Sequence, residues 1–168
     1  QTFLEMLRRL FGSAPKNTEE AKKTITAAPL HDVNYPSLVF IAWAKAVEGN
    51  EDLQLWLKDN GYPELYMATF AILLKDEARN WLIENGYAHL MAMINGAEGN
   101  LKAQEWLLKN NFETLYHMSL AIDHEDNSWY WLSKYASQEI RILTKCIQRV
   151  KDEIEENHND MHSIGKDV

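Results

Sequence analysis

Residues 98–112 read EGNLKAQEWLLKNNF, and residues 48–62 read EGNEDLQLWLKDNGY in the same frame. The tryptophans of these stretches belong to a set of four that are spaced 25 residues apart: Trp56, Trp81, Trp106 and Trp131. Each tryptophan is followed directly by a leucine. Because tryptophan is rare and the spacing does not drift, the pattern indicates a repeat architecture.

A helix is predicted around each of these tryptophans. Apolar or small residues recur at offsets −3, 0 and +1 from the tryptophan, which is the spacing of one helix face. Asn-Gly or Asn-Asn pairs follow at 60–61, 85–86 and 110–111, and both residue types tolerate the left-handed conformation of a helix C-cap. The tryptophan helices are therefore expected over about 51–59, 77–84, 101–109 and 127–134.

A second helix is predicted before each tryptophan helix. Apolar or small residues recur 16, 13, 10 and 9 residues before the tryptophan, and these offsets wind onto one helix face. The residue at offset −10 is never larger than alanine: Ala46, Ala71, Gly96 and Ala121. Such small side chains predict that two helices cross closely at this point.

Short polar turns join the two helices of each unit, at 48–50, 75–76, 98–100 and 123–126. Turns this short force antiparallel hairpins, and stacked hairpins share a continuous core. We therefore predict an all-α, two-layer right-handed α-α superhelix of about four 25-residue hairpins with helical caps. The expected divisions are an N-terminal cap and linker over 1–36, the repeat array over 37–136, a capping helix over 137–157 and a disordered tail over 158–168.

The quoted stretches 98–112 and 48–62 resemble the second half of an ankyrin repeat. The resemblance covers about 100 of the 168 residues. Ankyrin repeats have a period of about 33 residues and include a β-hairpin finger. A period of 25 residues leaves no room for that finger, and the Thr-Pro-Leu-His opening is missing. The resemblance therefore implies a binding scaffold built from ankyrin-like helix hairpins, and no functional residue is carried over.

Composition excludes several classes of protein. The net charge of −8 argues against nucleic-acid binding, which requires a basic stripe, but it is compatible with a basic protein partner. A single cysteine, Cys146, excludes an intramolecular disulfide, and its apolar helical context predicts a buried, inert thiol. No apolar run is long enough to span a membrane. We expect a cytoplasmic protein, with export by a cleaved signal as the alternative.

The two ends differ from the array. Phe3, Leu4, Leu7, Leu10 and Phe11 fall on one helix face beside Arg8 and Arg9. Two interpretations are open: an amphipathic cap on the first hairpin, and a membrane-surface anchor. From Gln138 to about Glu156 a longer helix with an apolar seam is expected to close the stack. Residues 151–168 carry six acids and two bases.

The candidate binding surface lies on the side of the pre-tryptophan helices that faces away from the predicted core stripe. Aromatic side chains and methionine on an outward face are typical of a binding surface. The alternative is that this stripe packs between repeats. The candidate residues are Tyr66, Phe70, Met91, Tyr116 and Leu120.

Histidines provide two weaker candidates. His158 and His162 have the i, i+4 spacing that can share a metal, but the third ligand and the glutamate of a zinc-protease motif are missing. The turn His124-Glu125-Asp126, with His117 and His89 on preceding helices, contains acid–base groups that no pattern brings together. No nucleophile elbow or phosphate loop is present, so we expect no enzyme, no bound metal and no cofactor.

The sequence favours a protein–protein or peptide interaction scaffold that uses one face of the array. Two alternatives stay open: an acidic inhibitor or immunity-type protein that neutralises a basic partner, and a small-ligand-binding helical domain. The oligomeric state is not determined. The tryptophans are expected to be structural, so that Trp81→Ala or Trp106→Ala lowers the free energy of unfolding by about 3–5 kcal/mol.

Overall fold

The computed structural model describes the backbone of residues 33–164 and the side chains of residues 33–160. This part of the chain forms nine helices and contains no strand. The predicted N-terminal cap and the side chain of His162 lie outside the described residues. In chain order the helices are α3 (Ser37–Val47), α4 (Glu51–Asp59), α5 (Pro63–Ile72), α6 (Asp76–Glu84), α7 (Ala88–Ala97), α8 (Leu101–Lys109), α9 (Glu113–Ile122), α10 (Asp126–Tyr135) and α11 (Gln138–Ile164).

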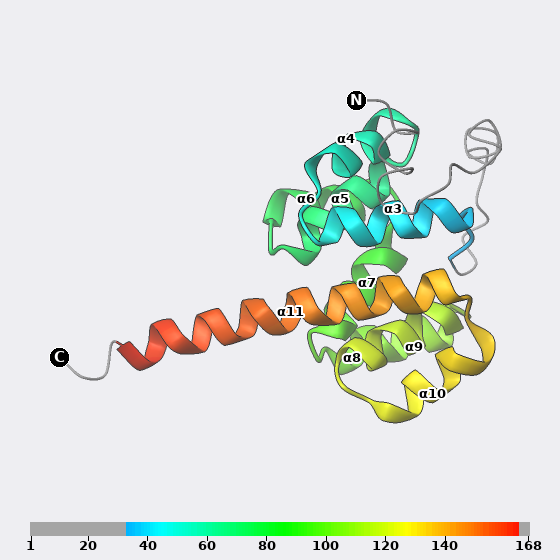
Figure 1. Ribbon diagram of the computed structural model, residues 1–168. Coiled ribbons are helices and arrows are strands. Elements are labelled where there is room, and N and C mark those ends of the chain that lie inside the picture. The colour runs from blue at the N-terminus through cyan, green and yellow to red at the C-terminus, as the bar shows by residue number, and fades with distance from the viewer. Residues whose placement is uncertain (1–32, 165–168) are drawn as a thin grey trace.

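Helices α3 to α10 pair into four hairpins, as the 25-residue period predicts (Figure 1). Local chemistry fixes both ends of the tryptophan helices. The Asn50 side chain accepts a hydrogen bond from the Leu53 amide at 3.0 Å, and Asn100 caps α8 in the same way. At the other end, the side-chain amide of Asn60 donates to the carbonyl of Trp56 at 2.8 Å, and Asn85 and Asn110 repeat this contact. The predicted bounds of α4 and α8 are confirmed.

The leucine that follows each tryptophan forms the core, and the tryptophan itself lies at its edge. Leu57, Leu82, Leu107 and Leu132 are fully buried. Trp106 is 39% exposed, and the other three tryptophans of the set are half-buried. In the first three hairpins, each indole stacks on the aromatic residue six positions later: Trp56 on Tyr62, Trp81 on Tyr87 and Trp106 on Phe112. The expected cost of Trp106→Ala is therefore too large.

The small residue at offset −10 marks a close crossing of helices α7 and α9. A Cβ atom added at Gly96 would lie 3.0 Å from Ser119 Oγ and 3.1 Å from both Ser119 Cβ and Gln104 Cγ. These distances are shorter than ordinary van der Waals contact, so even alanine would force the neighbours to move. The close approach inferred from the sequence is confirmed at this position.

A repeated hydrogen bond ties the two helices of the first three hairpins together. The residue two positions before the tryptophan donates to the carbonyl at offset −10: Gln54 to Ala46, Arg79 to Ala71 and Gln104 to Gly96. In the fourth hairpin the residue at this position is Trp129. Gln148 of α11 takes over, with its amide nitrogen 3.0 Å from the carbonyl oxygen of Ala121.

Helix α11 corresponds to the first helix of a fifth hairpin. Where the other hairpins turn, α11 continues as one straight helix. Its buried residues Ile140, Leu143, Cys146 and Ile147 lie 25 residues after the corresponding positions of α9. It packs against α9 and also against α3, at the opposite end of the array (Figure 1). Residues of the first and fifth repeats therefore meet, and α11 closes the curved stack, which refines the expected cap.

Helix α11 also extends further than expected. It continues to Ile164, so residues 158–164 are helical rather than a disordered tail. Its C-terminal turns pass beyond the other helices (Figure 1). Local contacts support the extension: Lys151 Nζ lies 3.1 Å from a Glu155 carboxylate oxygen, and His158 Nδ1 lies 2.9 Å from the carbonyl oxygen of Ile154.

Gln148→Leu should loosen the closure by α11. The substitution leaves the buried Ala121 carbonyl without this donor, so the free energy of unfolding should fall by about 1–3 kcal/mol. Urea denaturation followed by circular dichroism measures the change. Glu156→Leu, at an exposed position of the same helix, is the control and should change stability by less than about 0.5 kcal/mol. Equal effects of the two substitutions would contradict the role of Gln148.

Candidate functional site

A groove between α5 and α6 encloses a cavity with a volume of about 810 Å³. We call it the α5–α6 groove. It forms where two helices of one hairpin present aromatic and polar side chains to the same space. Its apolar lining is Tyr66, Met67, Phe70, Leu74, Ala78 and Trp81, and its charged lining is Lys75, Asp76 and Glu77.

The aromatic side chains of the groove are held in fixed positions. Tyr66 and Phe70 form an edge-to-face pair with ring centroids 4.9 Å apart. Lys58 Nζ lies 5.5 Å from the centroid of the Tyr66 ring. Trp81 stacks nearly parallel on Tyr87 at 5.8 Å. All three aromatic residues of the groove are partly buried against the core, so the groove has a rigid wall.

Leu74 is the least expected residue of the groove. It occupies the turn between α5 and α6 with φ of 65°, in the left-handed region, and 45% of its surface is exposed. The equivalent turn positions in the first and third hairpins are Gly49 and Gly99. A left-handed conformation costs a branched residue about 1–2 kcal/mol relative to glycine. The leucine therefore carries a local conformational cost while nearly half of its surface stays exposed, and backbone strain of this kind clusters at binding sites.

A second cavity adjoins the first through Leu74. It has a volume of about 380 Å³, and we call it the α11 pocket. Leu74 lines both cavities, so the apolar surface continues from α5 and α6 toward the C-terminal half of α11. The remaining lining residues of the α11 pocket are Ile72, Glu98, Lys151, Ile154, Glu155, His158 and Asn159.

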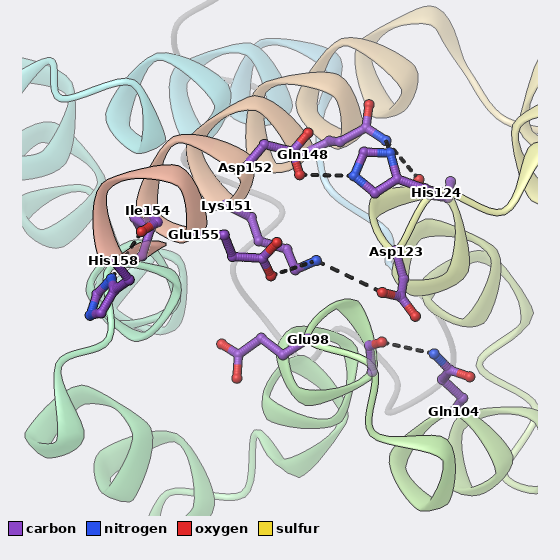
Figure 2. Close-up of polar contacts among 12 residues, drawn as sticks. Glu98, Gln104, Asp123, His124, Gln148, Lys151, Asp152, Ile154, Glu155 and His158 are labelled. Carbon is purple, nitrogen blue, oxygen red and sulfur yellow. Dashed lines mark hydrogen bonds and ion pairs between the residues drawn. The ribbon is translucent and has the colours of Figure 1, made fainter. Parts of the chain in front are cut away.

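Polar contacts hold α11 against the turn of the fourth hairpin, beside the α11 pocket (Figure 2). His124 Nε2 lies 2.9 Å from a carboxylate oxygen of Asp152, and its Nδ1 lies 3.2 Å from the amide nitrogen of Gln148. Lys151 Nζ reaches Asp123 at 3.8 Å and Glu155 at 3.1 Å. His124 is the counterpart of Leu74 and also has a left-handed backbone, with φ of 70°. These contacts stabilise His124 despite the conformational cost of its left-handed backbone. A bulky residue at this turn position can therefore make contacts with a neighbouring helix.

The predicted binding stripe is divided by the structure. Tyr66 and Phe70 line the α5–α6 groove. Met91 does not, because it is 3% exposed and belongs to the core. Helix α7 has buried residues around most of its circumference. The position that was predicted to face outward, Met91, is therefore covered by neighbouring side chains. Tyr116 and Leu120 are partly exposed on α9, outside the lining of the groove.

The histidines play structural parts within the described residues. His117 stacks on Trp131 with centroids 4.1 Å apart, and its Nδ1 lies 3.0 Å from Ser128 Oγ. Burial lowers the pKa of the His117 imidazole below its ordinary value, which favours the neutral ring. His89 stacks on Phe112. Residues 33–160 contain no group of three or more side chains that could hold a metal ion.

Cys146 lies at the interface of α11 with α3, at the small position of the fifth repeat. It is 6% exposed, and its thiol donates to a Glu48 carboxylate oxygen at 2.8 Å. Burial and the neighbouring carboxylate raise the pKa of the thiol to about 11. A thiol with a raised pKa is a weak nucleophile, so the reading of Cys146 as buried and inert is supported. No helix in the part of the chain that the structure describes is long and apolar enough to cross a membrane.

The first turn of α5 contains a buried carboxylic acid that no sequence pattern indicates. Glu64, in the first turn of α5, is 7% exposed and accepts a hydrogen bond from the Tyr35 hydroxyl at 2.9 Å. Burial raises the pKa of Glu64, and burial together with the Glu64 charge raises the pKa of Tyr35, Tyr62 and Tyr87. Tyr35 and Glu64 are 29 residues apart in the chain, so no local sequence pattern indicates that they form a pair. The contact fixes the entry of the chain into the array at the start of α5.

Glu64→Gln should change how stability depends on pH. Because folding raises the pKa of Glu64, the folded state binds the proton more tightly than the unfolded state, and stability falls as pH rises from the unfolded pKa through the folded pKa. The glutamine side chain does not titrate, so the stability of the Glu64→Gln variant relative to that of the wild type should increase from about pH 4 to about pH 7. Urea denaturation at both pH values tests this, with exposed Glu105→Gln as the control. A pH-independent difference would contradict the expectation.

No protein-family model, curated protein or solved structure matches the chain. The site is therefore interpreted from its own geometry.

Proposed function

We propose that the protein is a peptide-binding interaction scaffold whose binding site is the α5–α6 groove. The observation that supports this most is Leu74, an exposed leucine in a left-handed turn that lines both cavities. The partner would be an amphipathic helix, with apolar side chains against Tyr66, Phe70 and Leu74 and with basic side chains toward Asp76 and Glu77. Such helices are read in grooves through apolar anchors at helical spacing.

Two features favour a peptide over the alternatives. The lining is aromatic and apolar with charged groups beside Leu74, whereas a neutraliser of a basic partner would present a mainly acidic face. A small-ligand site would be a cavity with a few converging polar groups, and the titratable cluster around Glu64 is buried against tyrosines instead. We expect no catalytic activity. The ankyrin-like character of the hairpins is part of the proposal, since it rests on the turn and cap residues alone.

The test is selection of peptides from a random display library on the wild-type protein. Enriched peptides should combine apolar residues at helical spacing with lysine or arginine, and they should bind with micromolar dissociation constants. Leu74→Gly should weaken their binding at least tenfold, while the free energy of unfolding falls by no more than about 0.5 kcal/mol because the left-handed strain is relieved.

A matched control separates the groove from general surface hydrophobicity. Leu101 is a 70% exposed leucine at the start of α8, so Leu101→Ala should leave peptide binding unchanged. The proposal is wrong if no peptide is enriched, or if the enriched peptides bind the Leu74→Gly variant as tightly as the wild type.

A further inference from the structure

We propose that residues 3–11 of this same chain bind in the α5–α6 groove and act as its intramolecular occupant. The inference rests on the proposed function of the groove, and it names a ligand that the chain itself carries. Segment 3–11 reads FLEMLRRLF. The structure describes none of its residues, so the argument depends on its sequence and on the geometry of the groove.

The segment has the chemistry that the groove selects. Phe3, Leu4, Leu7, Leu10 and Phe11 recur at i, i+1, i+4, i+7 and i+8, which places them on one face of a helix. The groove offers the aromatic wall of Tyr66, Phe70 and Trp81 and the exposed side chain of Leu74 for such a face. Removing these apolar groups from water together is the main driving force for docking of this kind.

Charge is complementary between the segment and the groove. The segment contains Arg8 and Arg9 and a single acid, Glu5. Asp76 and Glu77 line the groove at the start of α6, and Glu98 and Glu155 line the adjoining α11 pocket. Glu98 is paired with Arg79, and Glu155 is paired with Lys151. Asp76 and Glu77 of the groove are therefore the carboxylates that carry the complementarity. Arginine side chains of the segment would meet carboxylates there, with which they form strong hydrogen bonds.

The chain enters the array at α5, one of the two helices that form the groove. The Tyr35 hydroxyl is fixed to Glu64, two residues before Tyr66 on the same helix. The 21 residues between Phe11 and Val33 can span up to about 70 Å, which is more than enough to bring the segment back to α5 and α6. Tethering converts docking into an intramolecular event with an effective concentration on the order of millimolar. A weak affinity of the segment is then sufficient for occupancy.

Paramagnetic relaxation in the full chain tests this placement. Gln1→Cys carries a nitroxide in a Cys146→Ala background, where alanine is the residue found at this repeat position in three of the four hairpins. We expect the amide signals of Tyr66, Phe70 and Trp81 to lose at least half of their intensity relative to the reduced label, while those of Ser133 and Lys134 on α10 keep theirs. Leu7→Glu with Leu10→Glu should restore the lost intensity.

Two controls make the result specific. Thr24→Glu with Thr26→Glu introduces the same charges outside the segment and should leave the loss of intensity in place. A mixture of isotope-labelled chain without nitroxide and unlabelled chain with nitroxide should show no loss. Loss of intensity in that mixture would mean that a second copy supplies the segment, which would overturn the intramolecular assignment.

The inference is also overturned if the signals of α5 and α6 keep their intensity, or if the double glutamate variant leaves their loss unchanged. Sedimentation with phosphatidylserine vesicles that depends on Leu7 and Leu10, without loss of intensity at α5 and α6, would identify the segment as a membrane anchor instead.

Display-selected peptides distinguish failure of this inference from failure of the proposed function. If they bind the groove while the nitroxide has no effect, the groove is a peptide site with another occupant. If the segment occupies the groove, it competes with the display-selected peptides. The peptides should then bind the double glutamate variant at least threefold more tightly than the wild type.

Discussion

Trp43→Ala should lower the free energy of unfolding by about 3–5 kcal/mol, the range expected when a fully buried tryptophan is truncated. Trp43 is 0% exposed and is among the largest fully buried side chains of the protein. It lies on α3, which packs against α4, α5 and α11, and it belongs to the buried core, so the substitution would open a cavity in that core. Denaturation in urea, followed by circular dichroism, measures the loss.

Two comparisons test the reason for this large effect. Trp106→Ala removes a side chain that is 39% exposed and stacks on Phe112, so it should cost only about 1–2 kcal/mol. Trp43→Phe keeps most of the buried apolar volume and should cost less than Trp43→Ala. The indole nitrogen of Trp43 is buried and has no hydrogen-bond partner among the described residues, so phenylalanine loses no hydrogen bond of that nitrogen. Equal losses for Trp43→Ala and Trp106→Ala would contradict the burial pattern.

Gly96→Val should lower the free energy of unfolding by about 2–3 kcal/mol through overpacking of α7 against α9. A single Cβ at this position already lies 3.0–3.1 Å from Ser119 and Gln104, and valine adds two further methyl groups. Because α7 and α9 join the third and fourth repeats, the strain falls on the interface that stacks the array. Thermal and urea denaturation both measure the loss.

A rescue experiment identifies the cause as the contact with Ser119. Ser119→Ala removes the hydroxyl that lies nearest to the added Cβ, so the combination with Gly96→Ala should cost less than the sum of the two single substitutions. Gly86→Ala is a matched glycine substitution in open space, since no atom lies within 4 Å of its added Cβ and only its backbone conformation is strained. Additive effects of Gly96→Ala and Ser119→Ala would argue against the packing explanation.

The repeat could be predicted from the sequence in detail. The bounds of α4 and α8, the turn positions and the close crossing at Gly96 all follow from residues within one 25-residue unit. The fifth repeat was also present in the sequence, because Ile140, Leu143, Cys146 and Ile147 fit the pattern of the inner helices. The fifth repeat was not recognised because Glu156 occupies the position where the other repeats have tryptophan.

The candidate site could be predicted only in part. Tyr66 and Phe70 were identified from their outward offsets, but the same offset in the third hairpin, Met91, is buried. A helical offset gives the direction of a side chain relative to its own helix, and exposure depends on what packs there. Leu74 could have been found by aligning the turns, since glycine occupies its position in the first and third hairpins.

The period, the helices and the turns follow from the sequence alone, because caps, left-handed residues and helix faces depend on neighbours only a few positions away. The tertiary structure alone decided that α11 returns to α3, where Cys146 meets Glu48 across 98 residues of chain. It also decided which tryptophans and which members of the aromatic stripe face solvent. The physical reason is that small rotations at each hairpin accumulate along the stack. The total rotation over the array determines which distant surfaces come into contact. The sequence of a single repeat does not specify this total.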